Sequence, residues 1–144
     1  MTPGGSASAV DWAVLRAAAQ AIRLKAYAPY SRFQVGAAAL VDDGRIVVGC
    51  NVENASYGLG LCAECSMVSA LIGSGGGTLI AVVCVGPEGD PVMPCGRCRQ
   101  VLWEHSRPDT LLESTRGILP MTAVLPDAFG PQDLVDRTPP VTQE

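Results

Sequence analysis

Two short cysteine-containing blocks place the strongest constraint on how this chain can fold. They are Cys62-Ala63-Glu64 and Pro94-Cys95-Gly96-Arg97-Cys98, and a long stretch of sequence separates them. Cysteine thiolates are good zinc ligands, and the Cys-x-x-Cys spacing of the second block is typical of two ligands for one ion. A zinc ion bound by Cys62, Cys95 and Cys98 requires a fold that brings both blocks to one point.

A fourth cysteine leaves two kinds of metal site open. Three protein ligands with a vacant fourth position are typical of catalytic zinc, whereas four protein ligands are typical of structural zinc. Cys65 would complete a four-cysteine site, because on a helix it projects to a side similar to that of Cys62. However, the 29 residues between Cys65 and Cys95 exceed the roughly 15–20 of a zinc ribbon. We therefore favour the catalytic arrangement.

Glu64 has two interpretations. A glutamate in the first turn of a helix often interacts only with the helix dipole, and on a regular helix it would point away from Cys62. At the helix end, however, a long side chain can curl toward a neighbouring metal. A carboxylate near a cation in a dry pocket can alternate between base and acid. The motif therefore predicts Glu64 as a proton carrier.

The composition predicts one domain over residues 1–144, with a core at about 10–130 and loose ends at 1–9 and 137–144. No apolar run reaches the ~18 residues of a membrane span, and we identify no signal peptide. The six cysteines are therefore expected to stay reduced in the cytoplasm, with Cys50 and Cys84 as buried apolar side chains. The net charge of −4 repels nucleic acid and suits a small neutral ligand.

Hydrophobic periodicity and turn residues predict the order of the elements. The segment from Val10 to Ala28 has helical spacing, with Asp11 as its cap and Pro29 as its stop. Further helices are predicted at 62–72 and 96–105, and a short one at 127–135. Strands are predicted at 33–41, 45–52, 79–85, 111–117 and 121–125, with a hairpin turn at 42–44.

This order predicts an α/β fold, a three-layer α/β/α sandwich around a mixed sheet of about five strands. The first two strands should be antiparallel neighbours, and the wholly apolar strand 79–85 should be central. Both cysteine blocks then fall at helix starts. Free N–H groups and the helix dipole stabilise thiolates there, so two facing helix starts could hold one zinc ion.

Four ordered blocks resemble a known family over about residues 11–130. The blocks are Tyr30-Ser31-Arg32-Phe33-Gln34-Val35-Gly36-Ala37-Ala38, Gly49-Cys50-Asn51-Val52-Glu53-Asn54-Ala55-Ser56-Tyr57-Gly58, Cys62-Ala63-Glu64, and Pro94-Cys95-Gly96-Arg97-Cys98-Arg99-Gln100-Val101-Leu102. Together they are similar to the small, homotetrameric, zinc-dependent cytidine deaminases. The resemblance implies hydrolytic deamination of cytidine and 2′-deoxycytidine, with release of ammonia, in pyrimidine salvage. It also implies one Zn²⁺ per subunit, held by Cys62, Cys95 and Cys98 beside Glu64, and pockets shared between subunits.

The same resemblance implies a set of substrate-binding residues. Without it, Phe33 would be interpreted as a core residue, and Asn51 and Glu53 as a solvated strand edge. With it, the ring of Phe33 is expected to pack on the pyrimidine, and Asn51 and Glu53 to hold the ribose 3′-hydroxyl. The other expected contacts, which include a backbone contact to the base edge and an aromatic ring from a neighbouring subunit, are Ala63, Asn54, Ser56, Tyr57 and Phe129.

One departure from the family pattern concerns charge. Arginine commonly follows Cys-Ala-Glu in this family, and here Cys65 stands in its place. Three thiolates around Zn²⁺ leave a formal charge of −1, which opposes deprotonation of bound water. We expect Arg97 or Arg99, together with N–H groups at the helix ends, to offset that charge, although both would otherwise be interpreted as surface residues.

Three other functions compete with this prediction. The first is deamination of another aminopyrimidine nucleoside of the blasticidin type. The second is a polynucleotide-editing deaminase, which the acidic balance argues against. The third is a non-catalytic interaction module held together by a four-cysteine zinc site, for which four sulfur ligands would be the signature.

Overall fold

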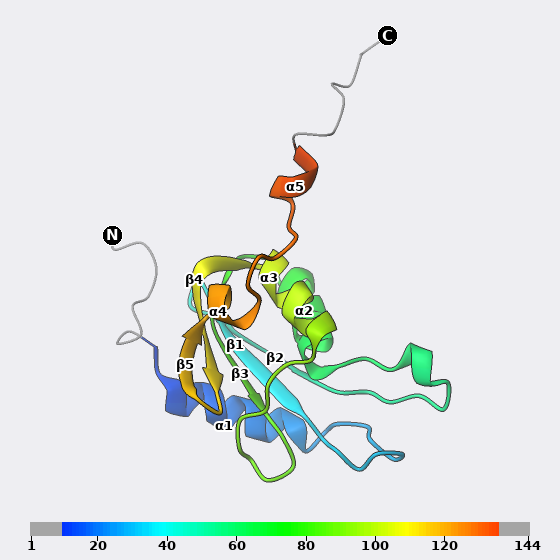
Figure 1. The fold of residues 1–144 in the computed structure, drawn as a ribbon. Helices are drawn as coiled ribbons and strands as arrows, with labels where there is room; N and C mark the ends of the chain where they lie inside the picture. Colours follow the sequence, from blue (N-terminus) through cyan, green and yellow to red (C-terminus); the bar gives the residue numbers. More distant parts are fainter. Residues whose placement is uncertain (1–9, 136–144) are drawn as a thin grey trace.

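The computed structural model describes residues 10–135, and in this part of the chain one sheet lies between helices (Figure 1). The strands are β1 (Gly36–Val41), β2 (Ile46–Cys50), β3 (Leu79–Val85), β4 (Ser106–Ser114) and β5 (Gly117–Pro120). The helices are α1 (Trp12–Arg23), α2 (Ala63–Gly73), α3 (Gly96–Glu104), α4 (Met121–Val124) and α5 (Gln132–Val135), with a 3₁₀ turn at Tyr57–Leu59. The loose ends predicted at 1–9 and 137–144 lie outside the described residues. Within residues 10–135, no helix has both the length and the apolar character needed to cross a bilayer.

The sheet is mixed, with the strand order β2-β1-β3-β4-β5. β1 pairs antiparallel with β2 and with β3, and the predicted hairpin turn joins β1 to β2. β3 and β4 run parallel because α3 crosses between them, and β5 returns antiparallel to β4. Every residue of β3 is buried, which confirms the predicted central strand.

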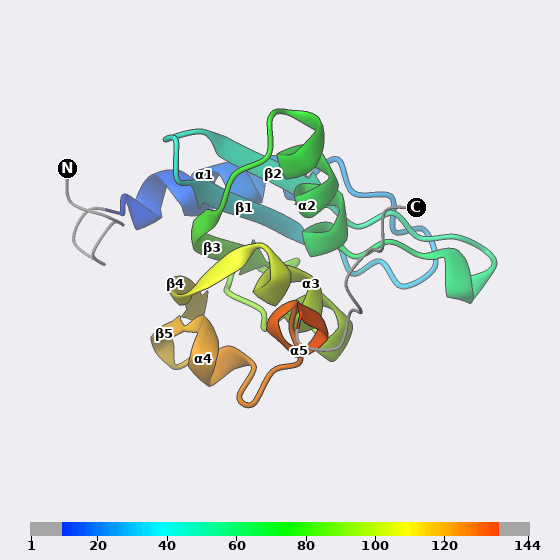
Figure 2. The ribbon, with the colours of Figure 1, turned by 90° about the horizontal axis from the view of Figure 1, so that it is seen from above.

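Two hydrophobic clusters, one on each face of the sheet, give the fold its three layers. On one face, Leu15 and Ala19 of α1 pack with Ala38 and Val83 of the sheet. The cluster on the opposite face combines residues of α2, α3 and α4 with strand residues, among them Met67, Leu71, Val82, Leu102, Leu112 and Met121. In Figure 2, seen from above, α1 passes behind β1 and β2. The arrangement confirms the predicted α/β/α sandwich.

Two glycines let helices contact the sheet backbone directly. A Cβ atom at Gly36 would lie 2.0 Å from the carbonyl oxygen of Ala19 in α1. A Cβ atom at Gly49 would lie 2.3 Å from the amide nitrogen of Met67 and 2.5 Å from the carbonyl oxygen of Ala63, both in α2. Because no side chain fits in either gap, glycine is required. Gly49 therefore fixes the first turn of α2 against β2.

The first helix is shorter than predicted. Asp11 caps α1 as expected, with its side chain accepting a hydrogen bond from the N–H of Val14. However, α1 ends at Arg23, whereas the predicted helix continued up to Pro29. The backbone of Tyr27 instead pairs with residues 51–53, so pairing between distant segments overrides the local helical periodicity.

The C-terminal third also differs in its details. β4 begins five residues before the predicted strand 111–117, and β5 follows it directly. The strand predicted at 121–125 is wrong, because this segment forms the helix α4. Met121 and Val124, three positions apart, are both buried, and such a short apolar run fits helical spacing as well as strand alternation. The predicted last helix is present as α5, within a narrower range.

Candidate metal centre and adjoining cavity

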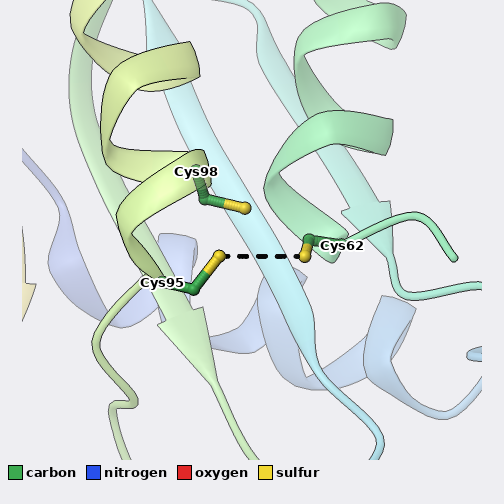
Figure 3. Close-up of side chains that lie close together, drawn as sticks. All are labelled: Cys62, Cys95 and Cys98. Carbon is green, nitrogen blue, oxygen red and sulfur yellow. Dashed lines mark hydrogen bonds between the residues drawn. The ribbon is translucent and has the colours of Figure 1, made fainter. Parts of the chain in front are cut away.

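The two cysteine blocks meet at the N-terminal ends of α2 and α3. Cys62 caps α2, Cys95 caps α3, and Cys98 lies in the first turn of α3. Figure 3 shows the three thiols pointing toward one another across the gap between the helices. Their sulfur atoms all lie within 4.8 Å of one another, and the Cys62 and Cys95 sulfurs are 4.0 Å apart. The predicted meeting of two helix starts is therefore observed.

The donor set and its spacing fit zinc. Tetrahedral zinc with Zn–S bonds of about 2.3 Å requires sulfur atoms about 3.8 Å apart, close to the separation found here. Burial raises the pKa of the Cys98 and Cys62 thiols. Burial also opposes ionisation of Cys95, but hydrogen bonds from the backbone and thiol of Cys98 lower its pKa. Three crowded thiols in this environment cannot all ionise unless a cation compensates their charge, which is the role that a bound metal would have.

Glu64 lies beside this cluster rather than away from it. Its side chain projects from the first turn of α2, and the residue is only 4% exposed. After burial, the nearby Glu64 carboxylate is the next cause of the raised pKa of both the Cys98 and Cys84 thiols. Glu64 takes part in none of the ion pairs found within residues 10–135. A buried carboxylate next to metal ligands is suited to proton transfer.

Cys65 does not join the metal-binding cluster. Among the described residues, the group of potential ligands contains Cys62, Cys95 and Cys98, and Cys65 lies half-buried outside it. The four-cysteine alternative therefore has no support in the geometry. Cys84 is fully buried as predicted, whereas Cys50, at the end of β2, is only partly buried.

A cavity of about 640 Å³ opens beside the sulfur cluster. Cys62 and Cys95 form part of its wall, so a bound metal would face the cavity. Five further residues that the sequence singled out also line it, namely Asn51, Glu53, Asn54, Tyr57 and Arg97. The lining also includes residues to which the sequence analysis assigned no role, which are Tyr30, Ser31, Val52, Gly60 and Leu61.

Besides Glu64 and Cys98, which lie behind the cavity wall, five predicted site residues do not line this cavity. Phe33 is about half exposed and its ring lies against Gly86, while Ala63, the first residue of α2, is buried. Arg99 donates hydrogen bonds to the carbonyls of Pro94 and Val124, so it ties the start of α3 to α4. The remaining two, both exposed, are Ser56 and Phe129.

Asn51 and Glu53 are already bonded within the protein. Asn51 donates a hydrogen bond to the carbonyl of Phe33 (2.9 Å) and accepts one from the N–H of Val35 (2.8 Å). The side-chain amide of Asn51 thus takes the place of strand pairing beside Phe33 and Val35. As a result, β1 begins at Gly36 and not at Phe33, where the sequence predicted its start. Glu53 accepts hydrogen bonds from Tyr30 and Ser31, and the Ser31 side chain is the main cause of the lowered pKa of Glu53.

Comparisons with known proteins agree with this geometry. Residues 12–112 match the family model of the cytidine and deoxycytidylate deaminase zinc-binding region. A cytidine deaminase from Mycobacterium tuberculosis is 58% identical over 125 residues, covering 87% of this chain and 94% of the relative. Its crystal structure superimposes with a TM-score of 0.82, covering 84% of this chain and 98% of that one. The structure of cytidine deaminase from Burkholderia pseudomallei has a TM-score of 0.75 at 42% identity, covering 83% of this chain and 100% of that one. The chain belongs to the cytidine and deoxycytidylate deaminase family of zinc-binding proteins.

Proposed function

We propose that the protein is a zinc-dependent cytidine deaminase that converts cytidine and 2′-deoxycytidine to uridine and 2′-deoxyuridine, with release of ammonia. The observation that carries this proposal is the cluster of three sulfur atoms, two of them in the cavity wall, with a buried carboxylate beside it. Family membership and the two cytidine deaminase structures support it further. The whole chain is proposed to form one domain with one zinc ion.

Cys62, Cys95 and Cys98 would hold the zinc ion, and Glu64 would move the protons. When bound, zinc would act as a Lewis acid and lower the pKa of a water molecule toward neutrality. Glu64 would accept a proton from the attacking water and deliver it to N3 of the cytosine ring. The water oxygen adds to C4, which becomes tetrahedral. Glu64 then carries the second proton to the exocyclic amino group, which leaves as ammonia.

The carboxylate of Glu53 favours a nucleoside with free sugar hydroxyls over a ligand phosphorylated at that end of the cavity. Among residues 10–135, Glu53 is the acidic residue that lines the cavity, and its lowered pKa keeps it ionised near neutral pH. An ionised carboxylate accepts hydrogen bonds from sugar hydroxyls and repels phosphate. With Asn51, it would hold the ribose 3′-hydroxyl, and Phe33 would pack on the base. The remaining substrate contacts are proposed for Asn54, Ser56, Tyr57, Ala63 and Phe129.

Exposed apolar side chains support an assembly of subunits. Several lie on the loops that flank the cavity, including Tyr27, Tyr30, Phe33, Tyr57, Leu59 and Leu61. Phe129, which is 58% exposed and lies away from the cavity of its own chain, would contribute to a neighbouring pocket. We infer a homotetramer with shared pockets, acting in cytoplasmic pyrimidine salvage without nucleic acid. Light scattering on the purified protein would measure the assembly, and a monomer would contradict this inference.

The activity can be tested directly by the loss of cytidine absorbance on addition of the purified protein. We expect turnover of cytidine and 2′-deoxycytidine, loss of activity with a zinc chelator, and recovery when zinc is restored. Cytidine 5′-monophosphate, a blasticidin-type nucleoside and single-stranded DNA complete the substrate panel. Preference for any of these three, or turnover that survives removal of the metal, would contradict the proposal.

Arg97 is proposed to offset the negative charge of the three thiolates, since it lines the cavity whereas Arg99 is bonded to two carbonyls. Replacing Arg97 by glutamine is expected to lower kcat/KM about fivefold, because one nearby charge contributes on the order of 1 kcal/mol. Arg97→Lys should retain most of the activity. The control is Arg116→Gln, which makes the same charge change at the exposed turn between β4 and β5. Equal losses in the two glutamine variants would remove Arg97 from this role.

A further inference from the structure

Ser31 joins two loops that meet at the cavity. Residues 24–35 connect α1 to β1, residues 51–62 connect β2 to α2, and both loops project from the same end of the sheet (Figure 1). Their backbones pair where Tyr27 donates a hydrogen bond to Asn51 (3.0 Å) and accepts one from Glu53 (2.8 Å). Beyond this pairing, side chains hold the two loops together.

The hydroxyl of Ser31 bonds in two directions. It donates to Oε2 of Glu53 and accepts a hydrogen bond from the N–H of Phe33 (3.0 Å). The backbone N–H groups of Ser31 (3.1 Å) and Tyr30 (3.0 Å) both donate to Oε1 of Glu53. Both oxygens of the Glu53 carboxylate are therefore oriented by the first loop, with Ser31 supplying two of the three donors.

The residue between Ser31 and Phe33 has a backbone conformation that must be held in place. Arg32 has φ of +59°, in the left-handed region that residues other than glycine rarely adopt. Its N–H donates to the carbonyl of Ala28 (2.9 Å), and the Ser31 hydroxyl fixes the residues on both sides. Without that hydroxyl, Arg32 could relax and carry Phe33 with it.

We propose that Ser31 is a positioning residue for substrate, whose hydroxyl couples the Glu53 carboxylate to the Phe33 backbone and holds both for nucleoside binding. This inference rests on the proposed function, in which Glu53 binds the sugar and Phe33 the base. Ser31 itself needs no contact with the reacting atoms, since it acts through its two partners. Its loss should therefore weaken binding without slowing the chemical step.

Steady-state kinetics of Ser31→Ala test this role. We expect KM for cytidine to rise about tenfold, because the Phe33 N–H and one Glu53 oxygen lose their partners, while kcat stays within about twofold. Ser31→Thr keeps the hydroxyl and should restore KM. The double variant with Ser31→Ala and Arg32→Gly should have a KM between those of Ser31→Ala and wild type, since glycine adopts a positive φ without strain. An unchanged KM, or a lowered kcat at unchanged KM, would overturn the proposal.

Limited trypsin digestion provides a measurement that does not depend on activity. Arg32 is an exposed cleavage site within the loop, and Arg116 is an internal reference at the turn between β4 and β5. Cleavage after Arg32 should be several-fold faster in Ser31→Ala, while cleavage after Arg116 stays the same. The matched control is Ser69→Ala, an exposed position on α2 that should change neither rate. Equal cleavage after Arg32 in wild type and in Ser31→Ala would overturn the coupling of the two loops by Ser31. If the wild type proves inactive but Ser31→Ala is still cleaved faster after Arg32, the coupling stands and only its link to the proposed function is overturned.

Discussion

Replacing Glu64 by glutamine is expected to lower kcat for cytidine by a factor of at least ~100, with zinc content and fold unchanged. The carboxylate is the buried acid beside the sulfur cluster, and the proposed reaction needs one group that both accepts and donates a proton. Glutamine has nearly the same shape and cannot ionise. The variant should therefore keep its thermal stability while losing the proton transfers.

Two measurements and a control variant separate this role from a structural one. Metal analysis should find one zinc ion per chain in wild type and in Glu64→Gln, and the KM for cytidine should change little. The control is Glu104→Gln, which makes the same change at an exposed position near the end of α3. Near-normal turnover in Glu64→Gln would exclude Glu64 from the mechanism, and loss of zinc would make it a metal-site residue.

Replacing Cys98 by alanine is expected to remove both zinc and stability. The thiol is fully buried in the first turn of α3, and it is one of three sulfur ligands. Zinc at 1,000 times its Kd stabilises the folded state by about 4 kcal/mol. Loss of zinc binding should therefore lower the Tm of a chain of this size by roughly 10 °C. Metal analysis and thermal unfolding, each with and without added zinc, measure the two losses.

Cys65→Ala provides the matched control, because it makes the same substitution in the first turn of α2 but outside the sulfur cluster. This variant should bind one zinc ion and deaminate cytidine at close to the wild-type rate. If Cys65→Ala loses zinc as Cys98→Ala does, the site has four sulfur ligands and no vacant position. Such a result would support the structural zinc module instead of the enzyme.

The metal site was the most predictable part of the molecule. Short motifs with a spacing set by local helix geometry contain Cys62, Cys95 and Cys98. The sequence alone therefore indicates that these cysteines bind one metal ion together. The central strand was equally clear because its seven apolar residues leave few other placements. The orientation of Glu64 was harder to predict, since a regular helix alone would have pointed it away from Cys62.

Features that depend on distant contacts could not be predicted. Nothing near Tyr27 shows that it pairs with residues 51–53 and so ends the first helix early. The segment 121–125 was wrongly predicted as a strand because five apolar-rich residues do not distinguish the two periodicities. Ser31 lies in one of the blocks that indicated the family, yet its link to Glu53 appears only when the two loops are seen together.

The backbone contacts at Gly36 and Gly49 have a consequence for how this protein can diversify. At these two positions α1 and α2 lie so close to the sheet that no space is left for even one methyl group. Cys62 and Glu64, at the start of α2, therefore belong to a closely packed part of the molecule, in which small changes are costly. The opposite wall of the cavity consists of loops joined by side-chain hydrogen bonds, which exchange partners easily. Substrate preference can consequently be altered in those loops by a few substitutions, while the chemistry stays the same.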